Sequence, residues 1–109
     1  GDVHSHWAGE VKRDFQDPES KSVAVELVTT SVTSAGNGLD EYPNTQTLLA
    51  ENPHVKFFNG RRGYVRAKLT QQEMKVDFRS LSRVTEPYAP AYTSGSFVVE
   101  PGDPSLHPA

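Results

Sequence analysis

The first residues of the chain place a carboxylate and two imidazoles at alternate positions, in the stretch Gly1-Asp2-Val3-His4-Ser5-His6-Trp7. In an extended strand, Asp2, His4 and His6 would project from one face, because successive side chains point to opposite sides. Carboxylates and imidazoles together suit calcium, iron, manganese or zinc. Ligands on one strand lie in a line, so a metal site here needs further ligands from elsewhere. The alternative is that both histidines are surface residues near a terminus, or the remnant of a tag.

Two further places carry polar side chains that could bind a ligand. Asn52-Pro53-His54 lies where a predicted helix meets a predicted strand, so its amide and imidazole could face a pocket. The simpler interpretation is a helix stop in which His54 caps the last carbonyl groups. Arg61 and Arg62 could hold a phosphate by bidentate hydrogen bonds, or could simply be solvated at the tip of a hairpin.

The composition excludes several function classes. The chain has 109 residues, a net charge of −3 and no cysteine. Its length allows one domain at most, or a piece of a larger one. The negative balance excludes the broad basic surface of nucleic-acid-binding proteins. The absence of cysteine excludes disulfides, thiolate zinc sites and a cysteine nucleophile within this chain.

The first half of the sequence predicts a strand, a loop and a short helix. Residues 22–30 are dense in β-branched side chains, which favours a half-buried strand. The small polar residues of 31–38 predict a loop that could bring backbone amides close to a ligand. A helix is predicted over 45–51, with Asn44 as its N-cap and Asn52 before a proline at its end.

The second half predicts an antiparallel meander. Residues 55–58 and 64–69 flank Asn59-Gly60, a turn signal that predicts a hairpin. Residues 74–79 alternate strictly between apolar and charged side chains, which predicts a strand with one buried and one solvent-exposed face. The aromatic residues near these strands are most simply core or strand-face residues; they are Trp7, Phe57, Phe58 and Tyr64.

Four motifs resemble, in their order along the chain, the C-terminal part of the alkaline phosphatase D (PhoD-like) family. They are Gly1-Asp2-Val3-His4-Ser5-His6-Trp7, Glu26-Leu27-Val28-Thr29-Thr30-Ser31-Val32-Thr33-Ser34 with Gly36-Asn37-Gly38, Asn52-Pro53-His54-Val55-Lys56-Phe57-Phe58-Asn59, and Arg62-Gly63-Tyr64-Val65-Arg66. The similarity spans roughly residues 1–80. The family belongs to the calcineurin-like metallophosphoesterases and includes secreted bacterial phosphatases and phosphodiesterases, among them an actinomycete phospholipase D.

The resemblance implies an α/β fold, a β-sandwich flanked by helices. Residues 1–109 would form the C-terminal segment of this single domain, mostly antiparallel β with one short helix. We expect a sheet core over 1–85 and an extended arm over 86–109, because the residues after Thr85 are rich in proline, serine and glycine. The apolar island at 97–99 would anchor the arm.

The resemblance also implies a metal site. The last metal-binding motif of the family resembles Gly-Asp-x-His, so Asp2 and His4 would be metal ligands and thereby catalytic. His6 lies beyond the motif, and no ligand role is implied for it. The implied cofactors are iron(III) and calcium, with zinc or manganese as alternatives, and a carboxylate in place of an imidazole agrees with a harder site. Three residues, together with the loop over 29–38, are expected near the substrate: Asn52, His54 and Arg62.

The implied function is metal-assisted hydrolysis of a phosphate ester, with in-line attack on phosphorus. Phosphodiesterase, phospholipase D and alkaline phosphatase activity all stay open. The earlier metal ligands of the family, including a cysteine, are not in this chain. We therefore expect a processed product of a secreted bacterial enzyme, inactive alone, whose partner is the N-terminal part of the same enzyme. The alternative is an isolated expressed fragment of that enzyme. We expect no nucleic-acid partner and at most peripheral membrane contact.

A function from another class is a non-catalytic β-rich binding or structural module. In that case the meander is the whole fold and the histidine cluster is incidental. A metal-sequestering or regulatory fragment is a third alternative, which the Asp-x-His-x-His pattern supports only through its donor types.

Overall fold

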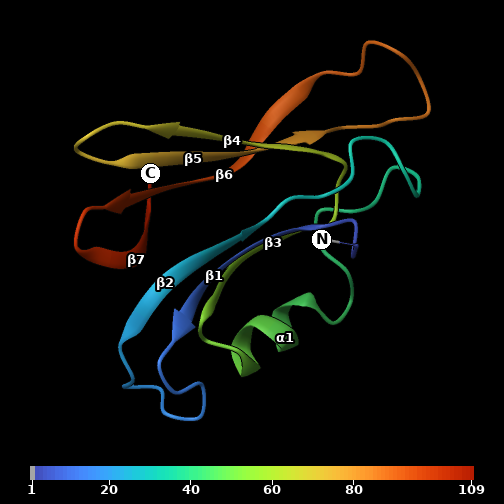
Figure 1. The fold of residues 1–109 in the computed structure, drawn as a ribbon. Coiled ribbons are helices and arrows are strands. Elements are labelled where there is room, and N and C mark those ends of the chain that lie inside the picture. Colours follow the sequence, from blue (N-terminus) through green and yellow to red (C-terminus); the bar gives the residue numbers. More distant parts are fainter. Residues whose placement is uncertain (1) are drawn as a thin grey trace.

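Residues 2–109 are the part of the chain that the computed structural model describes, and they form two antiparallel sheets and one helix (Figure 1). The strands of the first sheet are β1 (His6–Lys12), β2 (Ser22–Val28) and β3 (Val55–Asn59), in the order β2-β1-β3. Those of the second are β4 (Gly63–Leu69), β5 (Met74–Leu81), β6 (Ala91–Glu100) and β7 (Asp103–Pro108), in sequence order. The helix α1 spans Thr45–Glu51. The expected C-terminal β-sandwich portion, mostly antiparallel β with one short helix, is confirmed.

The two sheets pack face to face around a small apolar core. The fully or nearly fully buried members of this core are Ala8, Val76, Phe78, Phe97 and Leu106. Phe57 of β3 reaches across from the first sheet, and its ring centroid lies 4.8 Å from that of Phe78. In β5, Val76 and Phe78 are completely buried while Lys75 is exposed. The alternation predicted for residues 74–79 is therefore confirmed.

The first sheet has one face that packs against the second sheet and one outer face, because successive side chains of each strand point to opposite sides. His6, Ala8 and Glu10 point toward the second sheet, where the carboxylate of Glu10 accepts a hydrogen bond from the Leu106 amide at 3.0 Å. Trp7 lies beside Phe58 in the β1–β3 register, on the opposite face. The helix α1 lies against β3 on this outer side, away from the second sheet (Figure 1).

The helix α1 forms where the sequence predicts it. Asn44 precedes the helix but makes no capping hydrogen bond with its side chain. Instead, Thr45 Oγ1 accepts a hydrogen bond from the Tyr42 amide at 2.9 Å. At the other end, the side chain and backbone amides of Asn52 both donate to the Leu48 carbonyl, at 2.9 and 3.1 Å. None of the helical residues described forms a segment long and apolar enough to span a membrane.

The hairpin predicted around Asn59-Gly60 is wrong. β3 pairs with β1 and β4 pairs with β5, so residues 59–62 carry the chain from one sheet to the other. The side chain of Asn59 is used elsewhere: its Nδ2 donates to Asp40, and its Oδ1 accepts from the Arg61 amide and from Ser80. The Gly60 amide donates to the Asp40 carbonyl. Asn59 and Gly60 thus make hydrogen bonds to the loop before α1 and to β5, in place of the hydrogen bonds of a hairpin turn.

Residues 86–109 differ from the expected extended arm. They contain β6 and β7, and β6 is hydrogen-bonded to β5 along most of its length. The two strands join through Pro101-Gly102, where Gly102 has φ +76°, as a type II turn requires. Phe97 and Leu106 enter the core. The prolines of β7 are tolerated because this strand lies at the edge of its sheet.

Candidate functional site

Asp2 and His4 lie in a turn that precedes β1. Their φ angles are +71° and +50°, in the left-handed region. Residues other than glycine adopt this region at a cost of roughly 1–2 kcal/mol, and such strain is common at functional sites. Asp2 is exposed and His4 is half-buried. Gly1, the first residue of the motif, lies outside the described residues.

His6 belongs to the structural core, so the expected single face of Asp2, His4 and His6 is wrong. The ring of His6 is fully buried, and its Nδ1 accepts a hydrogen bond from the Thr30 amide at 3.4 Å. Its Nε2 therefore carries the proton and donates to the Arg79 carbonyl at 3.2 Å. Burial lowers the pKa of His6; the hydrogen bond to Arg79 opposes this shift. His6 is thus a neutral link between the two sheets.

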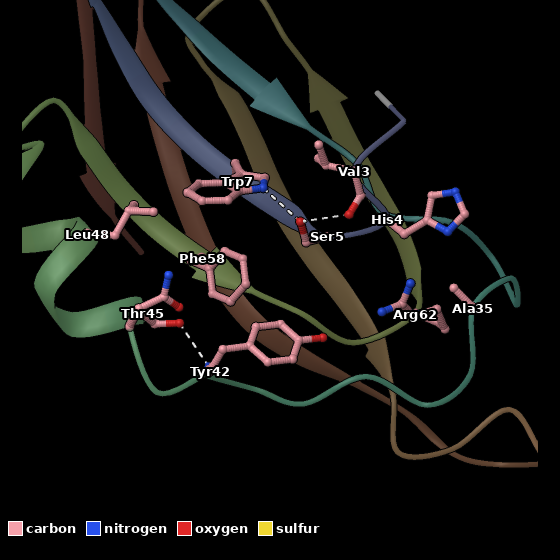
Figure 2. A pocket seen from close by; sticks show the side chains of 11 residues that line it. Val3, His4, Ser5, Trp7, Ala35, Tyr42, Thr45, Leu48, Phe58 and Arg62 are labelled. Carbon is pink, nitrogen blue, oxygen red and sulfur yellow. Dashed lines mark hydrogen bonds between the residues drawn. The ribbon is translucent and has the colours of Figure 1, made fainter.

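A pocket with a volume of about 410 Å³ opens beside the turn, between the outer face of the first sheet and α1 (Figure 2). We call it the aromatic pocket and define it by Trp7, Phe58, Tyr42, Leu48, His4 and Arg62. Trp7 and Phe58 meet edge to face, with ring centroids 4.7 Å apart. Figure 2 shows these two rings on one side and His4 with Arg62 on the other. The pocket therefore has an apolar end and a polar end.

Arg62 is buried at the polar end, with 3% of its surface exposed. Its guanidinium donates to the Gly60 carbonyl at 2.7 Å, to the Ser34 carbonyl at 3.1 Å and to Ser31 Oγ at 3.4 Å. Its Nε is buried and has no hydrogen-bond partner within the described part of the chain. The interpretation of Arg62 as a solvated hairpin residue is wrong. The loop over 29–38 contributes Ala35 to the lining of the aromatic pocket, and the hydrogen bonds from Arg62 to Ser31 and Ser34 hold it there.

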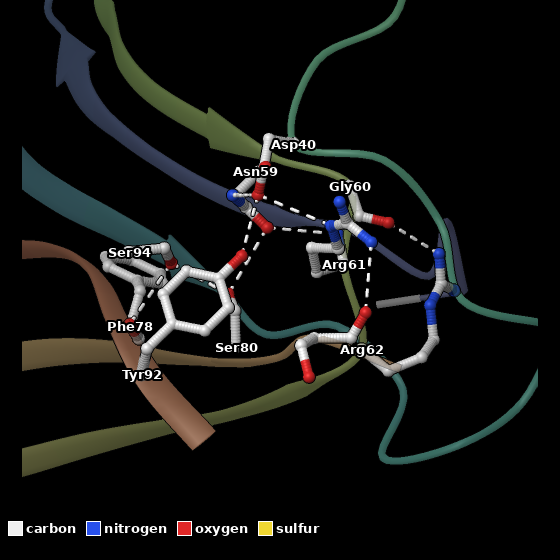
Figure 3. Close-up of polar contacts among 10 residues, drawn as sticks. Asp40, Asn59, Gly60, Arg61, Arg62, Phe78, Ser80, Tyr92 and Ser94 are labelled. Carbon is white, nitrogen blue, oxygen red and sulfur yellow. Dashed lines mark hydrogen bonds and ion pairs between the residues drawn. The ribbon is translucent and has the colours of Figure 1, made fainter. Parts of the chain in front are cut away.

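A polar network fixes the segment from which Arg62 extends (Figure 3). Asp40 Oδ1 accepts hydrogen bonds from Tyr92 at 2.7 Å, from Asn59 at 2.9 Å and from Arg61 at 3.4 Å. Ser80 Oγ donates to Asn59 Oδ1, which extends the network to β5. The hydrogen bonds from Tyr92 and Asn59 hold the pKa of Asp40 below its ordinary value, and Arg61 adds to this effect. The network ties the loop before α1 to both sheets.

Asn52 and His54 lie away from the aromatic pocket. Asn52 caps the end of α1, a role that the simpler sequence interpretation gave to His54. The His54 ring packs edge to face on Phe15, with centroids 4.9 Å apart. Its backbone carbonyl accepts from the Glu10 amide, near the far end of β1 from His4. The structure therefore does not bring these two residues to Asp2 and His4.

The donor set of this chain fits part of a metal site. Within residues 2–109, no group of three or more histidine, cysteine, aspartate or glutamate side chains converges on one point. Asp2 offers carboxylate oxygens and His4 an imidazole nitrogen, which suit iron, calcium, zinc or manganese. Zinc takes four ligands and calcium six to eight. The two side chains can therefore serve as ligands only together with donors from outside the described residues.

Sequence reasoning missed the wall of the aromatic pocket. Trp7 and Phe58 were interpreted as core or strand-face residues, and Tyr42 and Leu48 were not linked to them. The pocket depends on the β1–β3 register, which sets Trp7 opposite Phe58. Only the position of Trp7, at the end of the first motif, is a local signal for the pocket.

Comparisons with known proteins agree with one another. A family model described as PhoD-like phosphatase matches residues 1–78. Alkaline phosphatase D of Bacillus subtilis (strain 168) is 47% identical over 100 residues, which cover 92% of this chain and 17% of that protein. A solved structure described as "Structure of PhoD" matches with a TM-score of 0.93 and 44% identity, covering 100% of this chain and 21% of the other. The chain thus spans about a fifth of the length of these relatives.

Proposed function

Because the chain belongs to the PhoD-like phosphatase family, whose model matches residues 1–78, we propose that it supplies Asp2 and His4 to the metal centre of a phosphoric ester hydrolase. The other ligands would come from the part of the protein that lies outside this chain, since the chain spans only 17% of alkaline phosphatase D. That part, the N-terminal portion of the same enzyme, is the partner in this proposal. Asn52 and His54 are left out of the proposal because they lie elsewhere on the first sheet.

One observation carries the proposal. The strained turn holds His4 in the wall of a pocket that also contains the buried guanidinium of Arg62, and Asp2 lies two residues earlier in the same turn. A phosphoryl group needs positive charge and hydrogen-bond donors around its oxygens. Asp2 and His4 would hold the cations, and Arg62 would attract the phosphoryl group to the same place.

The metals in this proposal are iron(III) and calcium, with zinc and manganese as alternatives. Asp2 contributes hard oxygen donors and His4 a nitrogen donor, a combination that these ions accept. When bound, the cations would neutralise charge on the phosphoryl oxygens and lower the pKa of the attacking water. The turn contributes by fixing the positions of both donors before the metal arrives.

The substrate is a phosphate monoester or diester, phospholipids included, and the enzyme would be secreted. These points rest on the family resemblance and on the charge of the polar end of the pocket. Assaying p-nitrophenyl phosphate against bis(p-nitrophenyl) phosphate separates monoesterase from diesterase activity. Comparing the activity in culture medium with that in cells tests secretion.

The experiment that tests the proposal uses the full-length enzyme with Asp2→Asn or His4→Ala. We expect each substitution to lower kcat/KM by at least about 100-fold, because each removes a ligand of the catalytic metal centre. The bound metal, measured by plasma mass spectrometry, should fall as well. The melting temperature without metal should stay near that of the wild type, since both residues lie before the first strand.

The matched controls are Asp17→Asn and His107→Ala, which change the same residue types at exposed positions far from the turn. Both should keep full activity and metal content. Full activity in the Asp2 and His4 variants would contradict the assignment of these ligands. A full-length protein with neither metal nor hydrolytic activity would instead favour the non-catalytic β-rich module.

A further inference from the structure

We propose that the apolar end of the aromatic pocket binds the organic group of the phosphoric ester, so that the enzyme prefers esters carrying an aromatic or other bulky apolar substituent. This inference rests on the proposed function, because it assumes that the phosphoryl group sits at the polar end. It goes further by naming the side chains that select the substrate.

The apolar end is built from side chains that offer carbon surfaces. Trp7 and Phe58 form its wall, and Leu48 approaches from α1 (Figure 2). Tyr42 adds a third ring, whose centroid lies 5.9 Å from that of Phe58. Such a set binds apolar groups through burial of their surface and through ring contacts.

Two polar side chains at this end already make hydrogen bonds within the protein. The indole Nε1 of Trp7 donates to Ser5 Oγ at 2.8 Å, and Thr45 Oγ1 accepts from the Tyr42 amide. An apolar group that packs against the rings leaves both of these hydrogen bonds intact, so neither donor loses its partner.

The polar end and the apolar end belong to the same pocket, so one ester molecule can contact both. Its volume of about 410 Å³ is within the range of roughly 300–1,000 Å³ typical of small-molecule sites. The guanidinium of Arg62 complements the negative phosphoryl group, and the ring surfaces complement an uncharged substituent. Because one end is charged and the other is apolar, the pocket should bind an ester more tightly than inorganic phosphate or a free apolar alcohol.

The test measures binding of two phosphonates to the metal-loaded full-length enzyme by isothermal titration calorimetry. Methylphosphonate and phenylphosphonate share the charged group and differ in the organic group. We expect phenylphosphonate to bind about tenfold more tightly, a gain typical of filling an apolar pocket. Tyr42→Ala should reduce this ratio to near one, because it removes a ring from the pocket. Leu48→Ala is a second variant, which should reduce the ratio in part.

The matched control is Tyr64→Ala, which removes an exposed tyrosine from β4, outside the pocket, and should keep the wild-type ratio. Equal affinities for the two phosphonates in the wild type, or an unchanged ratio in both pocket variants, would overturn the inference. Hydrolysis of p-nitrophenyl phosphate and bis(p-nitrophenyl) phosphate is assayed in parallel. Retained hydrolysis with a ratio of one overturns this inference alone, whereas loss of hydrolysis together with no phosphonate binding overturns the proposed function as well.

Discussion

Two buried side chains determine the charge beside His4. Arg62 stays positive, as a guanidinium does in proteins, and its donors point to carbonyl groups of the surrounding loop. His6 is neutral at pH 7, because burial lowers its pKa and its Nδ1 is occupied as an acceptor. The polar end of the aromatic pocket therefore carries a fixed positive charge over the pH range in which phosphate esters are anionic.

At the residue scale, Asp40→Asn tests the network that supports Arg62. The hydrogen bonds from Tyr92 and Asn59 lower the pKa of Asp40 in the folded state. A lowered pKa stabilises the fold above the unfolded-state value of about 3.9, and this stabilisation is lost as the pH falls through the lowered folded-state pKa. We expect the variant to lose about 1 kcal/mol of unfolding free energy at pH 7, a value reduced by the exposure of the carboxylate.

The measurement is urea denaturation of wild type and variant at several pH values between 7 and 2.5. The difference between the two proteins should shrink below pH 4, because the wild type then loses the contribution of ionised Asp40. Asp17→Asn is the control and should show no comparable difference. A difference that stays constant down to pH 2.5 would contradict the role assigned to the Asp40 carboxylate.

The sequence could predict only those features of the site that depend on residues close together in the chain. The family motif assigns Asp2 and His4 as metal ligands, which stays a prediction, and the alternation wrongly places His6 on the same face. The difference arises from the backbone: Asp2 and His4 are in left-handed conformations, whereas His6 begins β1 and faces the second sheet. The pattern of residue types does not reveal which residues have a positive φ. The sequence alone therefore could not separate His6 from Asp2 and His4.

At the scale of the elements, local patterns predicted the strands better than their partners. The alternation of β5 and the stop signals of α1 depend on neighbours in sequence, and both were found correctly. The choice of partner strand depends on distant residues: β3 joins β1, where Phe57 packs against the core and Asn59 is buried. The position of β6 also depends on distant residues, because its Phe97 packs in the core with Val76 and Phe78 of β5.

Gly63 marks the point where the chain enters the second sheet, and its substitution tests this crossing. Its φ is +151°, and a Cβ here would overlap the Arg79 carbonyl oxygen. We expect Gly63→Ala to lower the free energy of unfolding by about 3 kcal/mol or more, because the backbone of β4 must shift away from β5. Urea denaturation at pH 7 measures the loss.

The control for Gly63 is Gly102→Ala. Gly102 also has a positive φ, +76°, but a Cβ there would meet no atom within 4 Å. Its substitution should cost only the strain of the left-handed conformation, about 1 kcal/mol. Similar losses in the two variants would show that the close approach to Arg79 is not what requires glycine at position 63.

At the scale of the whole molecule, the two-sheet sandwich presents the turn with Asp2 and His4, and the aromatic pocket, at one end of β1. Two donor side chains are too few for a complete metal centre, and the chain spans 17% and 21% of its two relatives. In the proposed function the remaining ligands come from outside this chain. The pocket could not be predicted because it is formed by residues from β1, β3, α1 and three connecting segments.

The most direct test of the central claim is anomalous X-ray scattering from crystals of the full-length, metal-loaded enzyme. We expect a metal peak roughly 2.0–2.2 Å from a ring nitrogen of His4 and roughly 2.0–2.6 Å from a carboxylate oxygen of Asp2. The same peak should lie at the polar end of the aromatic pocket, beside Arg62. Metal peaks at other residues, with Asp2 and His4 free of metal, would contradict the account.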